Sequence, residues 1–118
     1  MTIHSIAVLG AGQMGNGITQ VAAAAGYNVT MIDIEQAYVD KGLATIERSL
    51  GKLVSKERMT QEDADATIAR ISLSTDRADC ADCDLVVEAV PEIVDLKTSI
   101  FAFLHLQKYP MLYPYQLD

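Results

Sequence analysis

Three glycines near the N-terminus have the spacing that binds a phosphate group. Gly10, Gly12 and Gly15 form a G-x-G-x-x-G loop, which follows an apolar run ending at Leu9. The first glycine of such a loop permits a tight turn, and the second leaves the backbone amides open to a pyrophosphate. The third lets the following helix lie close to the strand, so that the positive end of the helix points at the anion. The predicted diphosphate-binding residues are Gly10, Ala11, Gly12, Gln13, Met14 and Gly15.

An acidic side chain follows at the distance that a dinucleotide requires. Residues 28–33 read as a second short strand that ends in an acid, and Asp33 lies 18 residues past Gly15. A carboxylate about 20 residues past the loop accepts hydrogen bonds from the adenosine ribose in dinucleotide-binding proteins. Because this carboxylate repels a 2′-phosphate and no Arg follows it directly, we expect NAD in preference to NADP. The other interpretation is a generic strand–helix–strand unit with a solvated Asp33.

The segments around these residues predict an α/β fold. Residues 3–9 are apolar with little alternation, which is typical of a strand buried on both faces of a parallel sheet. A helix follows, whose apolar face is expected to consist of Met14, Ile18, Val21, Ala22 and Ala25, and Gly26 is placed to end it. The further predicted elements are helices at 36–57 and 60–70, strands at 71–73 and 84–90, and a helix at 93–106.

This order of elements predicts a Rossmann-type doubly wound parallel sheet, incomplete, with a helical pair inserted after the second strand. The inserted pair is longer than a single crossover requires. It is either packing alone or one wall of a substrate groove. Ser49 and Lys56 share one face of the first inserted helix, since they are seven residues apart. From the residues alone, Ser49 and Lys56 belong either to a solvated face or to a binding surface.

Composition limits the function further. The chain has 118 residues and a formal net charge of −7, so it fits one domain and is not expected to bind nucleic acid or anionic lipid. No signal peptide or membrane-spanning stretch is evident, so a cytoplasmic location is expected. Cys80 and Cys83 form C-x-x-C, but acids surround them and the only histidines, His4 and His105, lack metal-ligand spacing. We expect a structural role for all four and no bound metal.

The glycine loop together with the segment Glu88-Ala89-Val90-Pro91-Glu92 resembles the L-3-hydroxyacyl-CoA dehydrogenases, including the bacterial 3-hydroxybutyryl-CoA dehydrogenases. The resemblance covers about residues 3–102 and includes the segments 46–50 and 72–76. It implies that residues 10–15 hold the pyrophosphate of NAD and that Asp33 holds the adenosine ribose. It also implies that Glu92 and Lys97 approach the nicotinamide. Their position in the sequence alone allows two interpretations, residues near the cofactor groove or ordinary loop residues. Ser49 and Lys56 match positions that contact coenzyme A in that family.

The family reaction is hydride transfer between C3 of a 3-hydroxyacyl-CoA and NAD, with a histidine base oriented by a glutamate and a serine and an asparagine that polarise the substrate oxygen. No position of this sequence matches that catalytic group, and His105 precedes the place where the base would fall. We therefore assign residues 1–102 to the NAD-binding domain and 103–118 to an atypical tail, which a truncation or a shifted reading frame would explain. The expected partner is an acyl-CoA, with NAD binding but no turnover by this chain. A sheet edge left without its next strand would favour self-association. The alternatives are an NAD-binding module without catalysis and a CoA-independent 3-hydroxy acid dehydrogenase domain.

Overall fold

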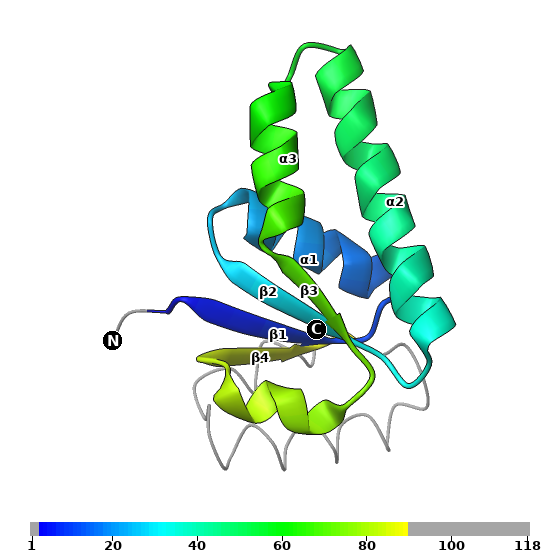
Figure 1. Ribbon diagram of the computed structural model, residues 1–118, viewed down its shortest axis with the longest axis vertical. Helices are drawn as coiled ribbons and strands as arrows, with labels where there is room; N and C mark the ends of the chain where they lie inside the picture. The colour runs from blue at the N-terminus through cyan, green and yellow to red at the C-terminus, as the bar shows by residue number, and fades with distance from the viewer. Residues whose placement is uncertain (1–2, 90–118) are drawn as a thin grey trace.

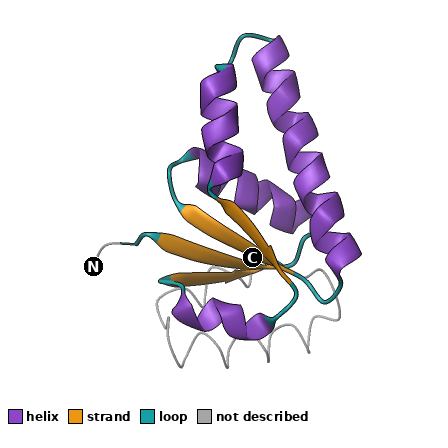
Figure 2. Ribbon diagram, in the orientation of Figure 1, coloured by secondary structure: helices purple, strands orange, loops and turns teal. Residues whose placement is uncertain are grey.

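The computed structural model describes residues 3–89, which form a four-stranded parallel sheet with helices on both sides (Figures 1 and 2). The strand order is β3-β2-β1-β4, and both neighbours of β1 run parallel to it. The doubly wound parallel arrangement predicted from the sequence is thereby confirmed. The elements in chain order are β1 (Ser5–Leu9), α1 (Gln13–Ala24), β2 (Asn28–Ile32), α2 (Gln36–Ser55), α3 (Gln61–Ala69), β3 (Ile71–Ser74), the 3₁₀ helix η1 (Arg77–Asp82) and β4 (Leu85–Glu88).

The strand register places the carboxyl ends of three strands side by side. Leu9 of β1 is paired with Ile32 of β2 on one side and with Glu88 of β4 on the other. The backbone N–H of Gly10 donates to the carbonyl of Ile32 over 2.6 Å, so the glycine loop begins directly beside the end of β2. In an open parallel sheet, ligands bind beyond the carboxyl ends of the strands.

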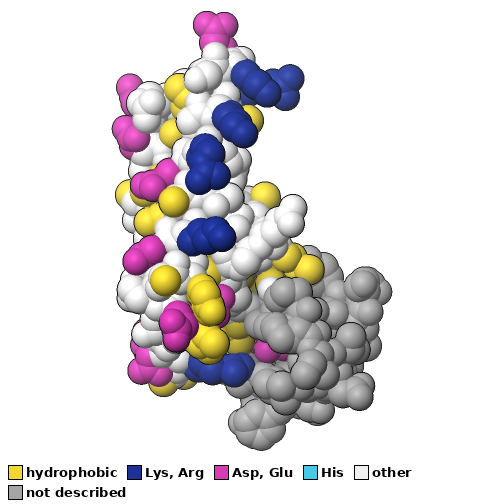
Figure 3. All heavy atoms as spheres, turned by 90° about the vertical axis from the view of Figure 1, so that its right-hand side faces the viewer, with side chains coloured by type: hydrophobic (Ala, Val, Ile, Leu, Met, Phe, Trp, Pro, Cys, Tyr) yellow, Lys and Arg dark blue, Asp and Glu magenta, His cyan; other side chains and the backbone are white. Residues whose placement is uncertain are grey.

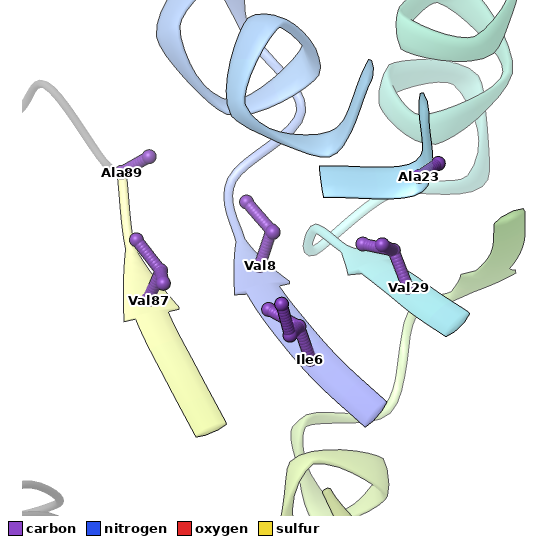
Figure 4. Close-up of a cluster of buried hydrophobic side chains, with 6 residues drawn as sticks. All are labelled: Ile6, Val8, Ala23, Val29, Val87 and Ala89. Atoms are coloured by element: carbon purple, nitrogen blue, oxygen red, sulfur yellow. The ribbon is translucent and has the colours of Figure 1, made fainter. Parts of the chain in front are cut away.

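The strand β1 is buried on both faces, as its apolar run predicts. Ile6 and Val8 point to the face that α1 covers, where they pack with Val29, Val87 and Ala23 (Figure 4). The alternating residues Ala7 and Leu9 point to the opposite face, where Ile32, Val86 and Cys83 complete a second cluster beneath η1. Burial on both faces explains why the run shows no polar alternation.

The hydrophobic pattern predicts the buried face of α1 only in part. Ile18 and Ala22 are half-buried and pack against the core, as predicted, whereas Met14, Val21 and Ala25 are exposed. Met14 and Val21 are 52% and 71% exposed, and the buried residues of this helix are Gly15, Thr19 and Ala23. These three positions recur every four residues and carry small side chains, so the helix backbone can lie close to the sheet. The most deeply buried line of α1 therefore consists of these small residues. At its end, Gly26 adopts the predicted positive φ, at 107°.

The predicted helical pair is α2 and α3, which form a hairpin that extends from the sheet on the same side as α1 (Figure 1). Thr60 caps α3 as its sequence predicts, because its hydroxyl accepts a hydrogen bond from the N–H of Asp63 over 3.1 Å. The apolar stripe of α2 packs over β2 and against α3. Its buried or half-buried members are Val39, Leu43, Ile46, Leu50, Leu53 and Val54.

Asp84 joins the beginning of β4 to the beginning of β1. Its carboxylate accepts hydrogen bonds from the backbone N–H groups of His4 and Ser5, over 2.8 and 3.1 Å. These two bonds hold the pKa of Asp84 below its ordinary value of 3.8, because they stabilise the charged carboxylate, and the bond from His4 has the larger effect. No local pattern predicts this contact, because its partners are 80 and 79 residues apart in the chain.

Cys80 lies in η1 and Cys83 directly follows it, and the two are not joined by a disulfide. The thiol of Cys83 donates to the carbonyl of Asp79 over 3.8 Å. Cys80 is half-buried and Cys83 is buried against the sheet. His4 is exposed at the amino end of β1. Among residues 3–89, no helix is long and apolar enough to cross a membrane. The predicted helix at 93–106, Glu92, Lys97, His105 and the tail at 103–118 lie outside the described residues.

Candidate functional site

The loop from Gly10 to Gly15 turns sharply from β1 into α1. Gly10 has a φ of 119°, a conformation that only glycine adopts without strain. Gly12 is the N-cap of α1, with no side-chain cap, and the first turn of the helix contains no acidic residue. The first N–H groups of a helix have no partner inside it, so this turn offers donors and a positive helix end to an anion.

Gly15 and Gly12 are required for different reasons. A Cβ atom at Gly15 would overlap the carbonyl oxygen of Gly10 and would lie 2.6 Å from its carbonyl carbon. Gly15 therefore permits the close approach of α1 to the loop. A Cβ atom at Gly12 would meet no protein atom within 4 Å, because this position faces the open cavity. The space beside Gly12 fits a ligand that must come close to the backbone, as a pyrophosphate does.

Asp33 directly follows β2, and its carboxylate faces the loop. One oxygen accepts a hydrogen bond from the N–H of Ala11 over 2.9 Å, and the other accepts from the N–H of Ile34 over 2.7 Å. The carboxylate is thus held in place by the backbone on both of its oxygens. Each oxygen keeps a further lone pair, which can accept from a ribose hydroxyl.

A single open cavity of about 570 Å³ joins the loop and Asp33. Five of the predicted residues line it: Gly10, Ala11, Gly12, Gln13 and Asp33. The other two loop residues do not line it, since Met14 is 52% exposed and Gly15 is buried beneath the loop. Six lining residues were not predicted from the sequence, namely Asn16, Ile34, Tyr38, Lys41, Gly42 and Thr45.

The unpredicted lining comes mainly from the first three turns of α2. Gly42 allows this contact, since a Cβ atom there would lie 2.9 Å from the carbonyl oxygen of Ala11 and 2.9 Å from the Met31 methyl carbon. Ile34 and Tyr38 are apolar side chains that stay 75% and 49% exposed at the rim of the cavity. An isolated glycine inside a helix is a signal of close packing, and Gly42 could have indicated this wall from the sequence.

Ser49 and Lys56 do not line the cavity but continue the same side of α2. Ser49 lies one turn beyond Thr45 and is half-buried, and Lys56 is the exposed C-cap residue of the helix. Lys52 lies between them and is also exposed. Figure 3 shows most of the basic side chains of this face of the molecule in a column along the hairpin. The column is a local cationic surface on a chain of net charge −7.

Glu88 is a further acid at the carboxyl edge of the sheet. It is 2% exposed and lies 3.8 Å from the guanidinium of Arg77, the first residue of η1. This ion pair ties η1 to the end of β4. Among residues 3–89, no group of histidine, cysteine or acidic side chains is arranged to hold a metal ion.

Comparison with known proteins agrees with this geometry. Residues 5–110 match the family described as 3-hydroxyacyl-CoA dehydrogenase, NAD binding domain. A probable 3-hydroxybutyryl-CoA dehydrogenase from Deinococcus radiodurans is 50% identical over 95 residues, which are 80% of this chain and 34% of that protein. A 3-hydroxybutyryl-CoA dehydrogenase from Bradyrhizobium diazoefficiens is 42% identical over 99 residues, which are 84% of this chain and 34% of that protein.

Solved structures give the same result. The crystal structure of (S)-3-hydroxybutyryl-CoA dehydrogenase from Ralstonia eutropha matches with a TM-score of 0.80 and 45% identity, over 85% of this chain and 35% of that one. The crystal structure of 3-hydroxybutyryl-CoA dehydrogenase from Escherichia coli K12 matches with a TM-score of 0.82 and 33% identity, over 90% of this chain and 22% of that one. The chain spans about a third of the length of the curated relatives that it matches.

Proposed function

The chain belongs to the NAD-binding domain family of the 3-hydroxyacyl-CoA dehydrogenases, and on this premise we propose that it is the cofactor-binding part of an enzyme that oxidises 3-hydroxyacyl-CoA. NAD is the cofactor of this family. When bound, NAD would accept the hydride from C3 of the substrate. The residues of this chain contribute the binding and orientation of the cofactor.

The observation that carries the proposal is the position of Asp33 beside the glycine loop, in one cavity. The N–H groups at the start of α1 would bind the pyrophosphate, and Gly12 leaves the space that it needs. The carboxylate of Asp33 would accept from the adenosine ribose, which selects a free 2′-hydroxyl. The exposed apolar side chains of Ile34 and Tyr38 at the rim suit the faces of an adenine ring.

The proposed contact with coenzyme A lies on α2. Ser49 and Lys56 follow the cavity wall along one side of this helix, so a second ligand bound there would lie next to the dinucleotide. A lysine is a suitable partner for the phosphates of coenzyme A. Glu92 and Lys97 remain proposed neighbours of the nicotinamide. They lie outside the described residues.

Calorimetric titration of the 118-residue chain with NADH and with coenzyme A tests both parts of the proposal. We expect saturable binding of each ligand. The double variant Ser49→Ala/Lys56→Gln should weaken coenzyme A about tenfold or more, because it removes a charged phosphate contact, and should leave NADH binding unchanged.

Arg58→Gln is the matched control, because it removes an exposed positive charge from the turn after α2, outside the helix that carries Ser49. It should leave the affinity for coenzyme A unchanged. A folded chain that does not bind NADH at millimolar concentration would refute the cofactor assignment. Equal losses of coenzyme A affinity in the double variant and the control would refute the assignment of Ser49 and Lys56.

A further inference from the structure

Lys41 is the one positively charged residue that lines the cavity, and Asp33 is the one acid. The first forty residues contain neither lysine nor arginine, so β1, the glycine loop, α1 and β2 supply no charged donor to a phosphate. A dinucleotide in this cavity would meet backbone amides, the end of a helix and a repelling carboxylate. The cation comes from α2 instead.

The position of Lys41 is fixed by its neighbour in the sequence. Gly42 brings α2 against the loop, so near that a Cβ atom there would lie 2.9 Å from the carbonyl oxygen of Ala11. Lys41 is exposed, and none of the ion pairs among residues 3–89 engages it. Its ammonium group is therefore available to a ligand in the cavity. A long flexible side chain with three donors can follow a phosphate in several positions.

We propose that Lys41 determines cofactor specificity together with Asp33, and this inference rests on the proposed function. The carboxylate of Asp33 disfavours a 2′-phosphate, and the ammonium group of Lys41 attracts it. NADPH carries more negative charge than NADH at the adenosine end, so it gains more from the same cation. Lys41 thus reduces the discrimination against NADPH that Asp33 alone would impose.

The test compares the dissociation constants of NADH and NADPH for the 118-residue chain and for Lys41→Gln. We expect this variant to weaken NADPH about tenfold and NADH about threefold or less, so that the preference for NADH increases. Lys52→Gln is the matched control, because Lys52 is an exposed lysine eleven residues further along the same helix and does not line the cavity. The control should leave both constants unchanged. The loss in Lys41→Gln should also diminish as the salt concentration is raised.

A second background keeps the test decisive if the unaltered chain binds NADPH too weakly to measure. Asp33→Asn removes the repelling charge with little change of shape and should strengthen NADPH about tenfold. Adding Lys41→Gln to this variant should remove most of that gain.

Equal losses of NADH and NADPH in Lys41→Gln, or no loss of either, would overturn the inference. A loss of the same size in Lys52→Gln would also overturn it, because the effect would then follow from total charge alone. If NADH binds and only the ratio fails to change, the proposed function survives and this inference does not. If the chain binds neither cofactor, both are refuted.

Discussion

Replacing Gly15 with alanine tests the reasoning about the glycine loop most directly. The added methyl group would overlap the carbonyl oxygen of Gly10 and would lie 2.6 Å from its carbonyl carbon. Both atoms belong to the backbone of a buried turn, so no side-chain rotation can relieve the overlap. Either α1 or the loop must withdraw by about 1 Å to restore ordinary contact.

The cost can be estimated from two opposing effects. Overpacking of this kind destabilises a protein by about 1–3 kcal/mol, and the higher helix propensity of alanine returns up to about 1 kcal/mol. We therefore expect Gly15→Ala to lower the free energy of unfolding by about 1–2 kcal/mol. A shift of about 1 Å also misplaces the amides that would hold the pyrophosphate, which should weaken NADH by at least tenfold.

Gly17→Ala is the matched control within the same helix. A Cβ atom at Gly17 meets no other atom within 4 Å, so only helix propensity changes and the variant should be up to about 1 kcal/mol more stable. Urea unfolding followed by circular dichroism measures the stabilities, and calorimetry measures NADH binding. If Gly15→Ala proves as stable as Gly17→Ala and binds NADH as well as the unaltered chain, the close approach of α1 to the loop is not required and our reasoning fails.

Two further predictions concern the loop and the sheet. Gly12→Ala should change the free energy of unfolding by no more than about 1 kcal/mol, because its Cβ atom meets no protein atom within 4 Å, yet it should weaken NADH at least tenfold in calorimetry; unchanged NADH binding would contradict the assignment of that space. Asp84→Asn should be less stable than the unaltered chain at pH 7, because the folded state holds the pKa of Asp84 below 3.8 and so favours its charged form. This difference in stability should persist down to about pH 4. It should disappear as the pH falls below 3.8 and then through the lowered folded-state pKa, because Asp84 becomes protonated in both states. Urea unfolding at several pH values measures the difference, and a difference that stays constant down to pH 2 would contradict the prediction.

The residues whose roles depend on local chemistry could be predicted from the sequence. Gly10 and Gly12 follow a buried strand directly, and the backbone conformation of the turn and the space beside it depend on residues within a short segment. Asp33 is fixed by the length of one strand–helix–strand unit. The capping of α3 by Thr60 is likewise a contact between residues three apart.

The contribution of α2 to the cavity could not be predicted in the same way. Tyr38, Lys41 and Thr45 reach the cavity because α2 packs against the loop at Gly42, and this contact joins elements that are remote in the sequence. The predicted apolar face of α1 was wrong at Met14, Val21 and Ala25 for a related reason. Hydrophobicity favours burial of Val21, but the helix makes its close approach at Gly15, and the fully buried positions are those in line with it, Thr19 and Ala23.

The helix α2 also fixes the distance between the two ends of the proposed ligand surface. Lys41 lines the cavity, and Lys56 directly follows the last residue of this continuous helix. At a rise of 1.5 Å per residue, the two lysines are about 22 Å apart along the helix axis. Inserting one residue between them would turn everything beyond it by about 100° and move Lys56 off the side on which the cavity opens. On the proposed function, a single inserted residue within α2 would therefore separate the coenzyme A contact from the cofactor cavity. Insertions can be accommodated in the turn between α2 and α3, where they change neither the rotation nor the span.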